Sequence, residues 1–329
     1  LSLLWSCCLP GCRTADAMIE ALLFDKGDNQ QLTCRLCAHL CVIGPGHRGR
    51  CGVRENRDGV LYSLVYGHTI ARHVDPIEKK PLYHFYPGSR SFSIATPGCN
   101  MHCHWCQNAG ISQVPRNLTF PVGDAMSPQQ IVAATQRSAS RSIAYTYTEP
   151  TVFFEYSYAT ARLAHAAGIA NVFVSNGYMT AEMLDLFQPY LDAANIDLKS
   201  FRDPTYRKYA GASLQPVLDS LKQLHDLGIW LEVTTLIIPG INDDPQELKE
   251  LAEFIVSELG AETPWHVSRF YPQYKLEHLP PTPPATITQA VEIGRAAGLA
   301  HIYAGNPVSY THLRAHETVL DLVCRLLLE

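Results

Sequence analysis

The sequence has little charge and no marked excess of either sign. Of its 329 residues 17% are charged, with 26 lysines and arginines against 31 aspartates and glutamates, and runs of like charge are short. Proteins that bind DNA, RNA or anionic membrane surfaces usually carry a basic patch or run. We therefore expect neither a nucleic acid nor a membrane as a partner.

The sequence also has no low-complexity tract and no internal repeat beyond an alternation of short strands and helices. Its most apolar stretch, at the beginning, is too short to span a bilayer, which takes about 20 residues. With 47% hydrophobic residues the chain can bury a large core. Its length suits one domain of about 200 to 250 residues with a smaller appendage.

Both ends of the sequence differ in character from the rest. Residues 1–17 are apolar but carry no basic leading segment, and we interpret them as a spurious or disordered leader before Met18. The alternative is a lipoprotein-type signal around residues 9–12. Residues 308–329 resemble an adapter-derived translation, so we expect an artefactual tail in which Cys324 has no function.

From residue 91 onward, short β-branched or aromatic runs alternate with amphipathic stretches of helix length. This alternation predicts repeated βα units and a parallel sheet. Six or seven such units predict an α/β fold with a full or partial (βα) barrel over residues 91–307, and a doubly wound open sheet is the alternative. The expected strands are 91–96, 142–147, 171–174, 194–198, 230–238, 266–270 and 300–303.

Polar residues follow the predicted strands, where the loops of a (βα) barrel build an active site. The first of these loops contains three cysteines. The later loops are 146–150, 175–177, 197–199, 239–243, 271–272 and 305–306. We therefore expect one site at the carboxyl ends of the strands.

Cys99, Cys103 and Cys106 have C-x3-C-x2-C spacing. A [4Fe-4S] cluster normally takes four thiolates, so three leave one iron without a protein ligand. That iron can bind the amino and carboxylate groups of S-adenosylmethionine (SAM), and a reduced cluster can pass an electron to the sulfonium and release a 5'-deoxyadenosyl radical. The alternative is a zinc site completed by His102 or His104.

The cysteine loop resembles the signature of the radical SAM superfamily, which has this spacing and an aromatic residue before the last cysteine, here Trp105. Further matching segments are 96–100, 106–108, 145–150, 174–177, 197–199 and 239–243. Together they resemble the subgroup related to pyruvate formate-lyase activating enzymes, and most closely the AmmeMemoRadiSam-system radical SAM enzymes. The similarity covers about residues 18 to 307.

The resemblance implies a set of SAM-binding residues. Trp105 would lie against the adenine, and Glu149 would end the segment that receives the SAM ammonium group, although residues 146–148 replace the glycines usual there. The remaining contacts, to the ribose or carboxylate and in the polar wall of the site, would come from Ser175, Asn176, Asp197 and Lys199.

A second cysteine group lies in a small cysteine-rich module over residues 18–90. Four thiolates among glycines fit a closed structural zinc site or an auxiliary iron-sulfur cluster, and unpaired reduced thiols are the alternative. Of the eleven cysteines in the sequence, seven fall in these two clusters, which favours metal binding in a reducing cytosol, so we expect a cytoplasmic protein. The four cysteines of this group are Cys34, Cys37, Cys41 and Cys51.

Some residues near these motifs are assigned no function from the sequence. Residues 75–82 also match the AmmeMemoRadiSam pattern, but we interpret Lys79 and Lys80 as surface charges beside a turn. His39 and His47 could replace a cysteine as metal ligands, and we interpret both as unliganded surface histidines.

The sequence therefore predicts an activating-enzyme-like oxidoreductase that cleaves SAM at a [4Fe-4S] cluster and abstracts hydrogen from a substrate. The electron donor would be a flavodoxin or ferredoxin. The substrate would be either a partner protein that receives a glycyl radical, or a small molecule or protein modified directly. A hypothesis from another class is a zinc-binding interaction module with a vestigial barrel.

Overall fold

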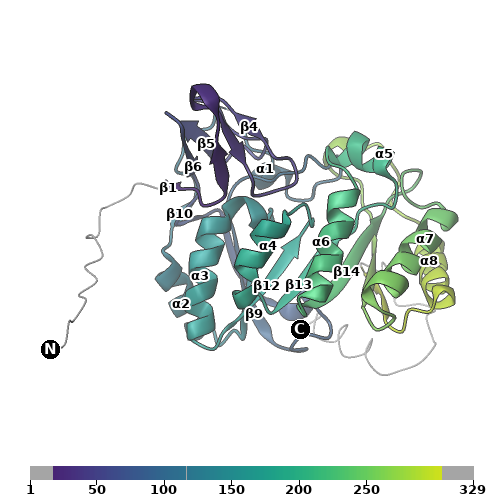
Figure 1. Cartoon of the computed structure of the whole chain (residues 1–329). Coiled ribbons are helices and arrows are strands. Elements are labelled where there is room, and N and C mark those ends of the chain that lie inside the picture. Colours follow the sequence, from purple (N-terminus) through teal and green to yellow (C-terminus); the bar gives the residue numbers. More distant parts are fainter. Residues whose placement is uncertain (1–17, 116, 306–329) are drawn as a thin grey trace.

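A computed structural model describes residues 18–115 and 117–305, and an eight-stranded sheet forms its centre (Figure 1). Along the sheet the strands follow the order β16-β15-β14-β13-β12-β11-β9-β8. All neighbours pair in parallel except β8, which is antiparallel to β9. The strands are β8 (Ala71–Pro76), β9 (Arg90–Ala95), β11 (Ser142–Tyr145), β12 (Ala170–Ser175), β13 (Ala193–Asp197), β14 (Trp230–Ile237), β15 (Trp265–Arg269) and β16 (Ile302–Gly305).

Amphipathic helices connect the parallel strands and bury their apolar sides against the sheet. A capping box begins α2, where the side chains of Ser127 and Gln130 bond each other's backbone. Among the described residues no helix is both long and apolar enough to cross a membrane. The main helices are α2 (Pro128–Arg137), α3 (Phe154–Ala166), α4 (Ala181–Phe187), α6 (Gln215–Asp226), α7 (Pro245–Phe254) and α8 (Pro284–Ala297).

Short helical segments complete the connections. Two of them, η5 and η6, have π-type hydrogen bonding, and η5 packs against the cysteine loop. The segments are α1 (Ala109–Ser112), η1 (Asp28–Gln30), η2 (Ile77–Lys79), η3 (Pro150–Phe153), η4 (Gln188–Tyr190), α5 (Asp203–Thr205), η5 (Tyr206–Ala210), η6 (Ile255–Leu259) and η7 (Tyr274–Leu276).

The predicted α/β fold is confirmed, and the seven expected strands are present within two residues at each end. The described sheet ends at β8 and β16, which do not pair with each other, so its form is a partial barrel. The sequence did not predict β8. Buried and exposed residues do not alternate along this edge strand, since only Asp75 is buried and Arg72, His73 and Val74 are all exposed.

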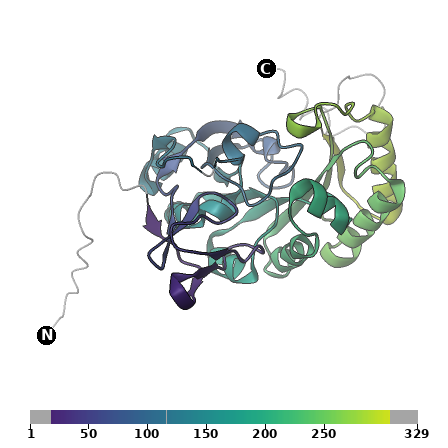
Figure 2. The ribbon, with the colours of Figure 1, turned by 90° about the horizontal axis from the view of Figure 1, so that it is seen from above.

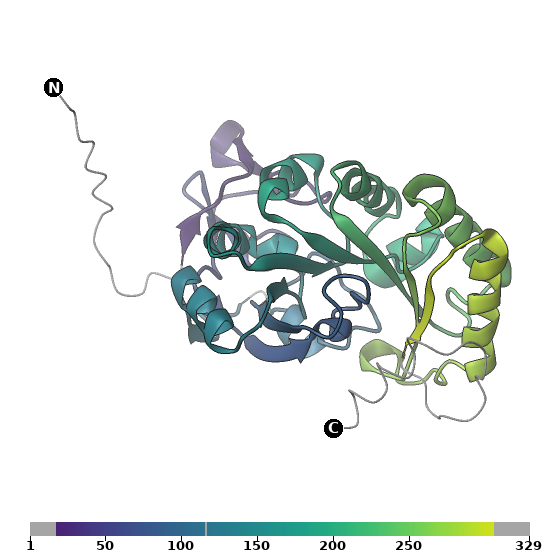
Figure 3. The same ribbon diagram turned by 90° about the horizontal axis from the view of Figure 1, so that it is seen from below.

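The chain after β8 folds onto the inner face of the sheet. Ile77 and Leu82 pack with small residues of β11, β12 and β13, and the Asn195 side chain of β13 donates to the Pro81 carbonyl at 2.8 Å. Figure 3 shows this blue segment below the strands, on the side opposite to α6. The inner face of the partial barrel is therefore filled from residues 77–88.

The N-terminal module consists of short antiparallel strands. It packs above α3 and α4 (Figure 1). Seen from above, the module does not extend over α7 and α8 (Figure 2). Two further strands, β7 (His68–Thr69) and β10 (Asp124–Ala125), pair beside it. The strands of the module are β1 (Ile19–Glu20), β2 (Phe24–Lys26), β3 (Leu32–Cys34), β4 (Val42–Ile43), β5 (Arg54–Arg57) and β6 (Val60–Ser63).

Candidate active site

The loop after β9 carries the three cysteines and is fixed by backbone contacts. The amides of His102 and His104 donate to the carbonyls of Ala210 and Tyr209 in η5, at 2.8 and 2.9 Å. Gly98 has a φ of 100°, and a Cβ there would lie 2.6 Å from a methyl group of Val53. The loop is therefore pressed against the N-terminal module, and only glycine fits at position 98.

The thiols of this loop lie in an enclosed environment. Burial raises the pKa of Cys103 to about 11, although the Lys199 ammonium opposes this shift. Burial and the Glu149 carboxylate raise the pKa of Cys99 well above its ordinary value. Cys106 shares a hydrogen bond with Ser112 Oγ at 3.1 Å. Since metal ligands must be thiolates, metal binding at Cys99 and Cys103 would release their protons.

The two histidines of the cysteine loop contact neighbouring side chains. Among residues 18–115 and 117–305, no three histidine, cysteine or acidic side chains surround a point that one metal ion could occupy. The His102 ring is instead bonded to Gln113 at 2.7 Å, and the His104 ring packs edge-on against Tyr209. In a [4Fe-4S] cluster each thiolate binds a different iron, so the three sulfurs need not converge on one point.

Glu149 joins the loops after β11 and β12. Its fully buried carboxylate accepts from the Ser175 hydroxyl at 2.8 Å and from the Asn176 amide at 2.9 Å. Thr151 adds a backbone and a hydroxyl donor to the same carboxylate. Burial raises the pKa of Glu149, and these hydrogen bonds act in the opposite direction. Glu149 and Ser175 are thus bonded to each other, inside the wall of the site.

Asn176 touches the cysteine loop directly. Its Nδ2 donates to Asn100 Oδ1 at 2.8 Å and lies 3.7 Å from the Cys99 sulfur. Its Oδ1 accepts from the Tyr178 amide at 3.0 Å. The following Gly177 has a φ of 71°, and a Cβ there would lie 2.8 Å from Ile196. The turn therefore aims Asn176 at the first cysteine.

A lysine-aspartate pair follows β13. Lys199 Nζ donates to Asp197 Oδ2 at 2.8 Å, and the Lys199 side chain is 13% exposed. Burial alone would lower the pKa of Lys199, but the Asp197 carboxylate raises it above its ordinary value. The result is a fixed positive charge beside the second cysteine.

Trp105 lies under the surface, 5% exposed, with its ring centroid 6.4 Å from that of Tyr209.

The other predicted site residues fall into two groups. Asn176, Asp197 and Lys199 lie around the cysteine loop, and Glu149 and Ser175 lie behind Asn176. Sequence reasoning missed Asn100, which is buried and bonds Tyr178 and Asn176.

Lys80 is not a surface charge. It is 1% exposed, its Nζ donates to Asp75 Oδ2 at 2.7 Å, and it lies over the Tyr147 ring at 4.5 Å. Burial alone would raise the pKa of Asp75, but bonds from Lys80 and Tyr147 hold it well below its ordinary value. The surface interpretation was wrong because segment 77–88 folds inward. Lys79, in contrast, is exposed as expected.

The four cysteines of the N-terminal module line one small cavity, together with Arg54. Burial, reinforced by neighbouring thiols, raises the pKa of Cys37 above its ordinary value, and burial raises that of Cys51 to about 11. The Nε of Arg54 is buried without a hydrogen-bond partner among the described residues. A buried N–H donor with no acceptor, beside four thiols, fits a group of metal-bound thiolates whose sulfurs accept hydrogen bonds.

The chain is similar in sequence to known proteins of one superfamily. Residues 93–255 match the radical SAM superfamily. MJ0808 of Methanocaldococcus jannaschii is 44% identical over 289 residues, which cover 88% of this chain and 85% of that protein. The pyruvate formate-lyase-activating enzyme of Listeria monocytogenes is 23% identical over 175 residues, covering 51% of this chain and 70% of the enzyme.

The chain belongs to the radical SAM superfamily. Within it, this radical SAM protein is related to the pyruvate formate-lyase activating enzymes, as the sequence predicts. A radical SAM methyltransferase from Sphaerobacter thermophilus shares its fold, with a TM-score of 0.54, 15% identity and 68% of each chain covered. The narrower resemblance to AmmeMemoRadiSam-system enzymes stays a prediction.

Proposed function

We propose that this protein is a radical SAM enzyme that cleaves SAM reductively at a [4Fe-4S] cluster held by Cys99, Cys103 and Cys106. The observation that carries the proposal is the arrangement around the three thiols. The Asn176 amide lies 3.7 Å from the Cys99 sulfur, and the Lys199 cation lies beside Cys103. A polar, charged wall next to an iron without a protein ligand suits the amino-acid end of SAM.

The bound cluster would pass one electron to the sulfonium of SAM and so release methionine and a 5'-deoxyadenosyl radical. The chain's own residues hold SAM for this step. Asn176 and Asp197 offer hydrogen-bond partners to its polar groups, and Trp105 contributes to the apolar side near the adenine. Glu149 and Ser175 act behind them by fixing the Asn176 turn.

For the substrate, two candidates follow from this function. One is a partner protein in which the enzyme generates a glycyl radical, and the relationship to pyruvate formate-lyase activating enzymes favours it. The other is direct modification of a small molecule or protein in an AmmeMemoRadiSam setting. Either reaction needs an electron, which a flavodoxin or ferredoxin would supply.

We also propose a second metal at Cys34, Cys37, Cys41 and Cys51. The terminal nitrogens of Arg54 bond Glu155, and its remaining Nε–H would find an acceptor in a thiolate sulfur of this group. The cavity between the thiols is small and enclosed by Val152 and Ile43. Four sulfur ligands fit either a structural zinc ion or an auxiliary iron-sulfur cluster. The alternative function is a zinc-binding interaction module with a vestigial barrel, in which metal would bind at these four cysteines and no cluster would form at Cys99, Cys103 and Cys106.

Metal analysis with electron paramagnetic resonance tests the proposal. Anaerobically reconstituted protein should contain about four irons with sulfide at the first site, and SAM should change the spectrum of the reduced cluster. Replacing Cys37 with Ala should remove the second metal and leave this spectrum in place. A colourless protein after reconstitution, or a spectrum that ignores SAM, would instead support the interaction module.

A further inference from the structure

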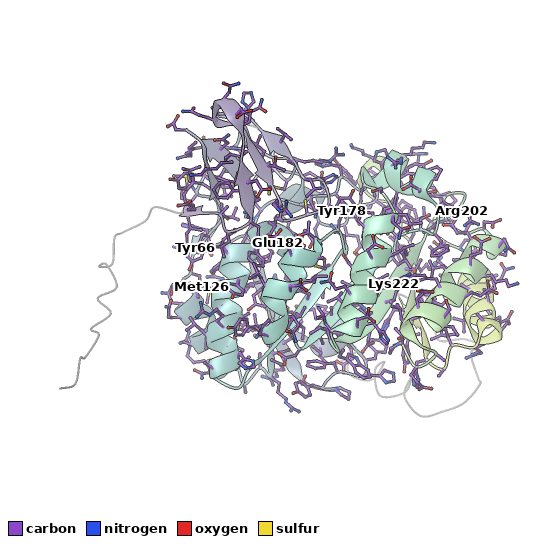
Figure 4. All side chains as sticks on the ribbon, in the orientation of Figure 1. Tyr66, Met126, Tyr178, Glu182, Arg202 and Lys222 are labelled. Carbon is purple, nitrogen blue, oxygen red and sulfur yellow. The ribbon has the colours of Figure 1, made fainter. Side chains whose placement is uncertain are left out.

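The second cysteine group lies directly on the loop that carries Asn176. Cys37 forms an isolated antiparallel bridge with Met179. The hydroxyl of Thr180 donates to the carbonyls of Arg35 and Leu36, at 2.8 and 3.3 Å. Figure 4 shows Tyr178 and Glu182 at this junction, below the N-terminal module. Residues 34–41, here called the knuckle, are thus bound to the loop after β12.

His39 stands between Cys37 and Cys41 and reaches from the knuckle into the first site. Its Nε2 lies 2.7 Å from the carbonyl oxygen of Asn100, and because a carbonyl only accepts, this nitrogen carries the proton. Its ring packs against Tyr178 with 4.7 Å between centroids. The sequence suggested an unliganded surface histidine, but His39 is half-buried and contacts both loops.

The two contacts of His39 close a ring of interactions around the first cysteine. Asn100 donates from its side chain to the Tyr178 carbonyl at 3.1 Å and accepts from Asn176 at 2.8 Å. Tyr178 donates from its backbone to Asn176 at 3.0 Å. Asn100, Tyr178 and Asn176 are all at most 6% exposed. Water therefore cannot easily replace a bond that is lost here.

We propose that His39 is a positioning residue that couples metal binding at the knuckle to SAM binding at the first cluster. A metal held by Cys37 and Cys41 fixes the knuckle, and His39 then holds Asn100 and Tyr178 so that Asn176 faces Cys99. The second metal would act on SAM affinity through this contact, without exchanging electrons. The proposal rests on the proposed function, since it assumes that SAM binds beside Asn176.

The structure explains why the knuckle needs a metal for this task. Its internal backbone bonds are few, from the amide of Cys34 to the carbonyl of Cys41 and from the amide of Leu40 to the carbonyl of Cys37. Leu40 is exposed and has a φ of 42°. A metal that joins four thiolates would replace this weak internal support, and its loss would release His39.

The test measures the SAM dissociation constant on anaerobically reconstituted full-length protein, with iron and zinc counted for each variant. His39→Ala should weaken SAM binding about tenfold, the effect of losing one buried hydrogen bond, while the first cluster keeps its iron. His39→Gln, whose amide N–H can reach a carbonyl, should restore most of the affinity. His47→Ala is the matched control, because His47 is exposed and bonds only the nearby Pro45 carbonyl.

A second variant tests the coupling. Cys41→Ser should lower both knuckle metal and SAM affinity, and adding His39→Ala to it should weaken SAM binding no further, since both act on one contact. Additive losses in the double variant would overturn the coupling. So would wild-type SAM affinity in His39→Ala, or loss of first-cluster iron in that variant. A wild-type protein with intact clusters that binds no SAM would overturn the proposed function itself, and this inference with it.

Discussion

The buried ion pair between Arg54 and Glu155 gives the sharpest stability prediction, because it joins the N-terminal module to α3. Arg54 donates two hydrogen bonds to the Glu155 carboxylate, at 2.9 and 3.0 Å, and the Leu22 amide donates a third at 3.0 Å. Each side chain of the pair is 2% exposed. The Glu155→Gln change keeps the shape but leaves the Arg54 charge buried without its partner.

Breaking such a pair from one side costs about 3–5 kcal/mol. For a chain of this size about 1 kcal/mol lowers the melting temperature by roughly 2–4 °C. Glu155→Gln should therefore melt about 6 to 20 °C lower than the wild type in anaerobic thermal denaturation at equal metal content.

A matched control is Glu182→Gln, which breaks the exposed Arg35–Glu182 pair across the same junction and should leave the melting temperature nearly unchanged. The double variant Arg54→Met/Glu155→Leu leaves no unpaired charge and should melt above Glu155→Gln. A Glu155→Gln protein that melts within about 2 °C of the wild type would refute the reasoning.

Three further predictions concern the inner face, acid stability and SAM binding. Asp75→Asn should lower the melting temperature far more than Lys79→Met, because it leaves the buried Lys80 without a counter-charge while Lys79 is exposed. Burial acts to raise the pKa of Glu232, but bonds from His266 and two backbone amides hold it below its ordinary value of 4.5. This stabilisation is complete above about pH 4.5 and is lost as the pH falls through the lowered pKa. Urea unfolding between pH 7 and pH 3 should therefore show an acid loss that Glu232→Gln lacks, and parallel curves would contradict the assignment. Asn176→Ala should weaken SAM binding by about 1–3 kcal/mol in equilibrium dialysis while iron content is kept, whereas unchanged affinity would remove Asn176 from the site.

Patterns that lie within short stretches of the sequence were enough to predict the α/β fold and to find the cysteine loop. Strand runs such as 142–147 and the spacing of Cys99, Cys103 and Cys106 lie within a few neighbouring residues, so sequence inspection is enough to find them. The polar edge strand β8 was missed because its residues resemble a loop when its partner β9 is not known. Pairing along a sheet is a tertiary property.

Contacts between distant segments could not be read from the sequence. Nothing near Lys80 indicates that its segment turns inward to Asp75 and Tyr147, and nothing near His39 indicates Asn100, which lies 61 positions along the chain. The family pattern assigns Glu149 to SAM, but only the folded chain reveals that its carboxylate is bonded to Ser175 and Asn176.

The central claim is tested most directly by counting 5'-deoxyadenosine formed from SAM under anaerobic conditions, with dithionite as the reductant and chromatography as the readout. The wild type should form this product together with methionine. Cys103→Ala should form none, because it removes one of three cluster ligands, while Cys106 and Cys99 alone cannot hold the cubane. Cys34→Ala, which alters the second cysteine group and keeps the three cluster ligands, should still form the product at saturating SAM. Full product formation by Cys103→Ala would contradict the account.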